Sequence, residues 1–147
     1  MASFADGLAE AASRVSSDPI DFSALRDLES IVNEQLEGDL PREECFIAFF
    51  LSLFLADVFY NLSGDFPYHL DDFVGETSLS ERWGTETFEI RREFFAKVPG
   101  SLDRVASKIR SRDWISALDE LAELSSCYLT TVRRLNVLGE EIIGQMT

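Results

Sequence analysis

Apolar residues recur every three or four positions along most of the chain, which is the period of an α-helix with one buried face. Such segments cover about residues 3–16, 21–37, 41–62, 78–97 and 101–111, and a long last one from 113 to a final turn near 143. No segment shows the sustained alternation of apolar and polar residues that is typical of strands in hairpins. The pattern predicts an all-α fold, a bundle of about six helices.

Proline, glycine and short polar side chains set the expected helix ends. We expect Pro99 and Gly100 to end one helix and Ser101 to cap the next. Asp113 is expected to cap the long C-terminal helix, because a carboxylate at this position accepts hydrogen bonds from the first backbone N–H groups. Gly139 is expected to interrupt that helix before its last turn.

The stretch CFIAFFLSLFLADVFY, residues 45–60, is the most apolar part of the chain. Its uninterrupted apolar run ends at Ala56 and is too short for a bilayer, which needs about 20 residues. A helix that is apolar on every side and too short to span a membrane is expected to be buried. We therefore expect a buried, Phe-rich central helix over about 41–62 and no membrane span. Small residues on one face should let another helix approach closely; they are Cys45, Ala48, Ser52 and Ala56.

Asp57 lies near the end of this apolar run, beside Tyr60 and Asn61. We expect it at the edge of the core, paired with an arginine or capping a neighbouring helix. A proton-transferring carboxylate is the alternative, but a general acid–base site needs a second titratable group nearby, and this helix offers none.

The length of 147 residues fits one domain, residues 1–147. The hydrophobic fraction of 46% and the charged fraction of 27% are those of an ordinary globular protein. Cys45 and Cys127 lie within apolar helical patterns without Cys or His partners at metal-binding spacing, so we expect two buried thiols. The N-terminal residues lack the pattern of a secretion signal, which favours a cytoplasmic protein.

Sequence motifs for catalysis or cofactor binding are absent from the chain. There is no HExxH, no glycine-rich phosphate loop and no GxSxG. His69 with Asp71 and Asp72 could ligate a metal, but adjacent carboxylates on a loop usually face water. We therefore predict no catalytic residues, no metal site and no cofactor.

The net charge of −14 belongs entirely to the first part of the chain. Residues 1–81 carry 17 acids and three arginines, whereas residues 82–147 carry ten acids and ten bases. An acidic field repels nucleic acid and anionic lipid and attracts basic surfaces. Solubility or adaptation to high salt would also explain acidity, but salt adaptation should spread acids over the whole surface.

Three classes of function are consistent with this charge pattern. The first, which we favour, is a small interaction module of the inhibitor, immunity, antitoxin or chaperone type that engages a basic protein surface through its acidic N-terminal half. The second is a small helical enzyme with a site assembled from separated carboxylates, and the third is a protein that mimics DNA. The sequence also permits a homo-oligomer.

Residues 65–76 form the longest segment without helical periodicity, and it combines aromatic rings with carboxylates. Rings supply buried area and acids supply orientation in an interface with a basic partner. The alternative is that the rings pack under the loop and close the core. The predicted partner-binding residues are Asp65, Phe66, Tyr68, Asp71, Asp72, Phe73 and Glu76.

Overall fold

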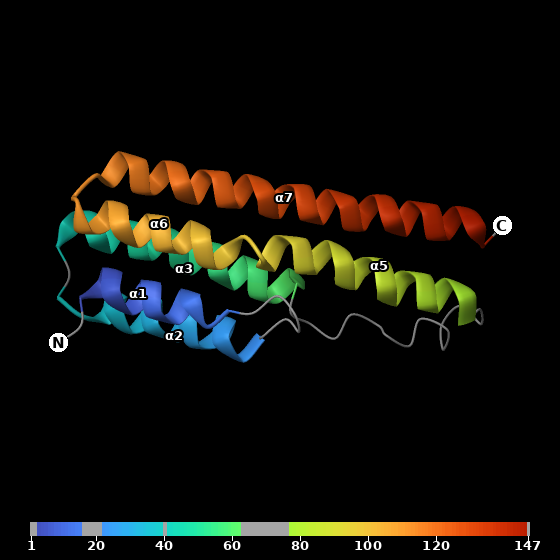
Figure 1. The fold of residues 1–147 in the computed structure, drawn as a ribbon, viewed down its shortest axis with the longest axis horizontal. Helices are drawn as coiled ribbons and strands as arrows, with labels where there is room; N and C mark the ends of the chain where they lie inside the picture. Colours follow the sequence, from blue (N-terminus) through green and yellow to red (C-terminus); the bar gives the residue numbers. More distant parts are fainter. Residues whose placement is uncertain (1–2, 16–21, 40, 63–76, 147) are drawn as a thin grey trace.

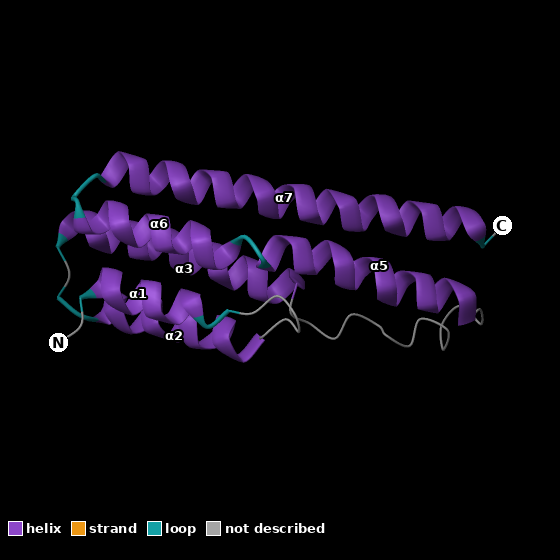
Figure 2. Cartoon of the chain, viewed as in Figure 1, coloured by secondary structure: helices purple, strands orange, loops and turns teal. Residues whose placement is uncertain are grey.

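The computed structural model describes residues 3–15, 22–39, 41–62 and 77–146. Helices account for nearly all of these residues, and none of them lies in a strand, which confirms the all-α class (Figure 2). The helices are α1 (Phe4–Ser13), α2 (Phe22–Glu37), α3 (Arg42–Leu62), α5 (Thr77–Phe95), α6 (Val98–Arg110) and α7 (Trp114–Gln145).

The helices form an elongated bundle that is organised along α7 (Figure 1). Helix α7 has 32 residues, and α5 and α6 follow one another along it in the opposite direction. Around the N-terminal half of α7, neighbouring helices close a ring in the order α1, α2, α3, α7, α6. Helix α5 packs mainly on the C-terminal half of α7, and this pair extends beyond α1–α3 (Figure 1).

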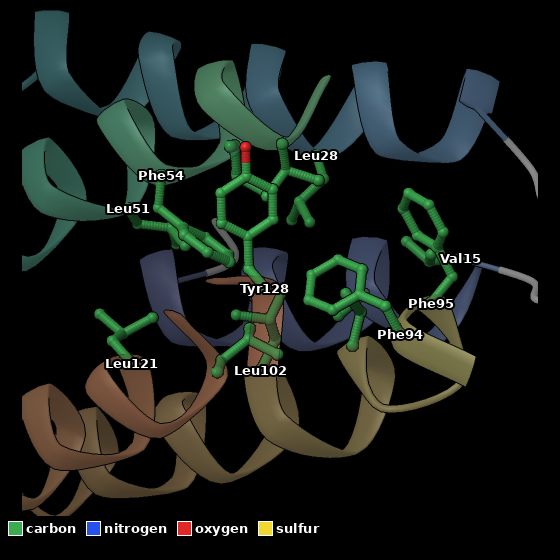
Figure 3. Packing of buried hydrophobic residues seen from close by; sticks show 14 of the residues in the cluster. Val15, Leu28, Leu51, Phe54, Phe94, Phe95, Leu102, Leu121 and Tyr128 are labelled. Atoms are coloured by element: carbon green, nitrogen blue, oxygen red, sulfur yellow. The ribbon is translucent and has the colours of Figure 1, made fainter. Parts of the chain in front are cut away.

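One hydrophobic core runs through the ring and receives side chains from every helix (Figure 3). Tyr128 of α7 lies near its middle, with its ring centroid 5.9 Å from that of Phe54 on α3 and 5.9 Å from that of Phe94 on α5. Phe94 and Phe95 pack edge to face at 5.3 Å. Aromatic pairs at such distances contribute beyond their buried area, so this cluster joins three helices that are distant in the sequence.

Ion pairs also hold the α5–α6 segment against α7. Arg104 pairs with Glu120 at 3.0 Å, and Arg134 of α7 pairs with Glu93 of α5. Further along, Arg82 pairs with Glu141, near the C-terminal end of α7. These side chains are partly exposed, and pairs of this kind each contribute at most about 1 kcal/mol.

Two of the expected helix ends differ from the structure. Pro99 and Gly100 lie in the first turn of α6, which begins at Val98, so Ser101 is inside the helix and does not cap it. Proline is tolerated there because a first-turn N–H has no partner within the helix. Gly139 does not interrupt α7, since beyond it Ile142 is still buried and Glu141 still pairs with Arg82 of α5. Asp113 does cap α7, and its carboxylate accepts from the Ser116 N–H at 3.2 Å.

The turn between α6 and α7 has the hydrogen bonds of a Schellman motif. The N–H of Asp113 donates to the carbonyl of Lys108, and the N–H of Arg112 donates to that of Ile109. Arg112 takes the left-handed position with φ 56°, the only positive φ at a non-glycine residue in the described part of the chain. Glycine usually occupies this position because a Cβ is unfavourable there.

The expectation of two buried thiols is wrong for Cys45, which is exposed, and Cys127 is only partly buried. The predicted small-residue face of α3 packs against another helix only in part. Ala48 is buried, and the Ser52 hydroxyl donates to the Asn33 side chain on α2 at 2.7 Å, but Ala56 faces outward. Close approach to α2 therefore involves the middle of that face.

Candidate functional site

The partner-binding residues that the sequence predicts lie outside the described residues. This applies to all seven of them, Asp65, Phe66, Tyr68, Asp71, Asp72, Phe73 and Glu76, and also to His69. Their role as a contact surface stays a prediction. Among the residues that the structure does describe, no group of three or more His, Cys, Asp or Glu side chains could hold a metal ion.

Helix α3 exposes a row of large apolar side chains, which Ala56 and Asp57 interrupt between its last two members. The prediction that this helix is buried on every side is therefore wrong. We call the row the aromatic face of α3; its members are Phe46 (60% exposed), Phe49 (55%), Phe50 (38%), Leu53 (59%) and Tyr60 (85%). Spacings of three, four and seven residues place them on one side of the helix.

The ring of helices explains why this face is exposed. Helix α3 packs against α2 on one flank and α7 on the other, and it directs Ile47, Leu51 and Leu55 into the core. A helix at the edge of a ring contacts only its two neighbours and the interior, so its outer side meets solvent. Large side chains on that side contribute nothing to the core of the described bundle.

The aromatic face is large for a protein of this size. With about 150–250 Å² per aromatic side chain, the exposed part of the five residues is on the order of 500 Å². An exposed apolar surface of this size is at the upper end of what monomeric proteins show, and such surfaces are often functional. By length and composition α3 is also the one helix in the described part of the chain that could cross a membrane, although 41% of its most apolar stretch is buried in the bundle.

Helix α7 extends the apolar surface on one flank. Helices α3 and α7 run side by side in the same direction (Figure 1), so that Asn61 reaches Tyr128 and Phe46 lies near Leu118. Two further apolar residues share this side of α7 with Leu118 by helical spacing, one a turn before it and the other three turns after it. They are Ile115 (71% exposed) and Leu129 (55%).

A pocket of about 290 Å³ opens between the beginnings of α3 and α7. Its apolar walls come from Phe46, Ile47, Trp114 and Leu118. Arg42 and Glu43 supply its polar edge. Ile47 is 1% exposed and belongs to the core, whereas Trp114 and Leu118 are partly exposed. The pocket is thus a hollow at one end of the aromatic face, backed by the core.

Carboxylates on α2 and α3 have no cationic partner among the residues that the structure describes. Helices α2 and α3 carry seven acids against Arg26 and Arg42. The acids are Asp27, Glu29, Glu34, Glu37, Glu43, Glu44 and Asp57. The ion pairs found in the described part of the chain include none of these seven. On α5–α7, by contrast, five glutamates pair with arginines.

Asp57 lies at the edge of the core, and its bonding partner is an amide and not an arginine. Its side chain is exposed and accepts a hydrogen bond from Asn61 Nδ2 at 3.1 Å. The same nitrogen donates to the Tyr128 hydroxyl at 2.8 Å. Burial of that hydroxyl, together with the neighbouring carboxylate of Asp57, raises the pKa of Tyr128 to about 12. A tyrosine that holds its proton so strongly is suited to fixing α7 against α3, and unsuited to proton transfer near neutral pH.

The opposite flank of α7 carries three shallow hollows along its boundary with α5 and α6. Their volumes are about 300, 140 and 410 Å³, and Thr130, Arg134 and Cys127 each line two of them. Arg134 is paired with Glu93, and this arginine holds the pKa of the glutamate below its usual value. Because these charges are already matched, this flank offers less to a charged partner than the aromatic face does.

The expectation that the phenylalanines of α3 lie in the core is right for Phe54 and wrong for Phe46, Phe49 and Phe50. The sequence did contain a signal for an exposed face, namely the large number of apolar residues on all sides of α3. A small bundle has room for apolar residues on about half of each helix, so an excess indicates either a central helix or an exposed face.

Comparisons of the chain with protein-family models, with curated proteins and with solved structures find no match.

Proposed function

We propose that this protein is a small interaction module that binds a basic protein surface through the aromatic face of α3 in its acidic N-terminal half. The observation that supports this most directly is the exposure of Phe46, Phe49 and Leu53, each more than half exposed. Exposed rings of this kind gain free energy when a partner covers them, and aromatic residues dominate the energetics of interfaces.

The surrounding carboxylates favour a basic partner over other proteins. Seven acids on α2 and α3 have no ion-pair partner among the described residues, so their charge is available to an approaching cation. Complementary charge raises the association rate and orients the encounter, while the buried rings supply most of the affinity. This division of roles fits an inhibitor, immunity protein, antitoxin or chaperone.

Several broader features belong to the same proposal. The chain acts as one domain, it works in the cytoplasm without spanning a membrane, and it does not bind nucleic acid directly. The net charge of −14 supports the last point, because phosphate backbones repel such a field.

The test is capture of partners from the native host by the tagged chain, followed by mass spectrometry. Phe49→Asp removes a ring from the aromatic face, and Val137→Asp is the matched control, since Val137 is 52% exposed on a distant part of α7. We expect a basic protein to be captured by the parent chain and by Val137→Asp but not by Phe49→Asp. Capture that does not depend on Phe49 would contradict the proposal.

The captured partner also permits a kinetic test. The association rate with that partner should fall steeply as salt is raised, because exposed charges are screened over about 8–10 Å at physiological ionic strength. A rate that stays flat across the salt series would remove the electrostatic part of the proposal.

A further inference from the structure

The pocket between α3 and α7 indicates what kind of partner the aromatic face accepts. We infer that the partner presents a basic amphipathic helix, which lies along the aromatic face and inserts one large apolar side chain between Phe46, Trp114 and Leu118. This inference rests on the proposed function and specifies its ligand. It follows from the shape of the surface, the size of the pocket and the position of the charges.

The shape favours a helix as the occupant. Phe46 and Tyr60 are 14 residues apart on α3, which is about 21 Å at 1.5 Å per residue. Two parallel helices, α3 and α7, form the sides of this surface. Helices that bind along such a surface use anchors at spacings of three, four and seven residues, and about four turns would match this length.

The size of the pocket favours a single side chain. Small-molecule sites usually have volumes of about 300–1,000 Å³, and 290 Å³ is at the lower limit of that range. The walls are apolar on both helices, with polar groups only at Arg42 and Glu43. A leucine or an aromatic ring from the partner would lose its contact with water there and pack on Ile47, which is already part of the core.

The charges decide between a basic helix and other occupants. Glu43 lies at the edge of the pocket, Glu37 is exposed at the end of α2, and Asp57 is exposed on α3 between Leu53 and Tyr60. Lysine or arginine on the shoulders of the bound helix would face these acids. A second copy of this chain carries −14 and an anionic lipid surface is also negative, so both would be repelled.

The fluorescence of Trp114 offers a direct measurement of occupancy, because this residue lines the pocket. Trp83→Phe leaves Trp114 as the only tryptophan, since the chain has two. Two synthetic peptides of Leu and Lys serve as probes, one arranged as an amphipathic helix and the other with the same composition permuted so that it has no apolar face. We expect a saturable change in Trp114 emission with the amphipathic peptide, and affinity at least tenfold weaker for the permuted one.

Variants then separate the pocket from the rest of the surface. Leu118→Arg places a cation in the pocket and should weaken the amphipathic peptide at least tenfold, whereas Val137→Arg, with the same charge change on the same helix, should stay within twofold. Phe46→Ala is a second pocket variant, which adds no charge and should also weaken binding. It provides the test if Leu118→Arg fails to fold. Circular dichroism and urea unfolding establish that each variant is folded.

Each contrary result has a distinct meaning. If the pocket variants bind the peptide like the parent while Leu53→Asp does not, the pocket inference is wrong and the proposed function stands. If both peptides bind equally, the interaction is only one of charge, and both proposals fail.

Two further outcomes would identify a different occupant. If neutral phosphatidylcholine vesicles shift Trp114 emission and the peptide does not, the face binds membrane. If the chain alone sediments as a dimer that Leu118→Arg dissociates, the occupant is a second copy. Either of the last two outcomes overturns the inference.

Discussion

Tyr128 and Asp57 join α7 to α3 across 71 residues of sequence. The Tyr128 hydroxyl donates to the backbone carbonyl of Asp57 at 3.3 Å, and Asn61 Nδ2 donates to the same carbonyl at 2.9 Å. Tyr128 is 5% exposed and contacts Phe54 and Phe94, so its ring belongs to the core while its oxygen bonds to the adjacent helix. The pair fixes the position of the helix that carries the aromatic face.

Tyr128→Phe should lower the free energy of unfolding by about 1 kcal/mol, because it removes the hydroxyl and leaves the ring in place. The loss stays modest because Asn61 keeps its bonds to Asp57. Urea unfolding measures the difference. Tyr60→Phe is the control, since Tyr60 is 85% exposed and its hydroxyl should contribute nothing measurable. Equal stability of Tyr128→Phe and the parent chain would show that the hydroxyl does not link the two helices.

The raised pKa of Tyr128 predicts a specific loss of stability at high pH. The folded chain keeps the proton up to about pH 12, whereas the unfolded chain releases it near its ordinary value of 10.0. The unfolded state therefore binds fewer protons between these values, so this contribution is fully present below pH 10 and declines as pH rises toward 12. The free energy of unfolding of the parent and of Tyr128→Phe, measured between pH 10 and pH 12, isolates this effect. The difference between the two free energies should become smaller as the pH rises. A gap that is constant with pH would contradict it.

Leu51 and Leu53 are close in sequence, but truncating them to alanine should change the free energy of unfolding by very different amounts. Leu51 is fully buried, and Leu51→Ala should cost about 2–5 kcal/mol. Leu53 is 59% exposed, and Leu53→Ala should change stability by no more than about 0.5 kcal/mol. Urea unfolding compares the two variants in the absence of a partner. A large loss for Leu53→Ala would mean that another part of the chain covers the aromatic face.

Arg112→Gly should stabilise the protein by about 1 kcal/mol, because it removes the cost of a Cβ in the left-handed conformation. The Schellman hydrogen bonds around it use only backbone atoms and should remain. Arg112→Ala is the control, since it removes the charge and keeps the unfavourable Cβ. If alanine and glycine raise the melting temperature equally, the charge and not the backbone is responsible.

Gly139→Ala should also stabilise the protein, by about 0.5–1 kcal/mol, because alanine loses less conformational entropy within a helix. A Cβ added at Gly139 would meet nothing within 4 Å. Gly84 in α5 has the same open surroundings and provides an independent second site. The two gains should add in thermal unfolding of the double variant. Destabilisation at Gly139 would indicate that α7 is interrupted there after all.

Local sequence determined the helical class and most helix limits. The period of apolar residues places α2 and α3 within a residue or two of their observed ends, and the side chain of Asp113 starts α7 through bonds to its own first turn. These features depend on neighbours only a few residues away. The same local reading fails at Gly139 and Pro99, where packing and the free N–H groups of a first turn outweigh ordinary helix preference.

Tertiary structure alone decided which side of α3 is buried. The composition of α3 shows that apolar residues surround the helix, but burial depends on how many neighbours it has. The ring order gives it two, α2 and α7, so Leu51 enters the core while Phe49 and Leu53 face outward. The pocket at Trp114 and the contact between Tyr128 and Asp57 likewise join segments about 70 residues apart. The periodicity within one helix cannot predict contacts between such distant segments, because these contacts depend on how all the helices pack around one core.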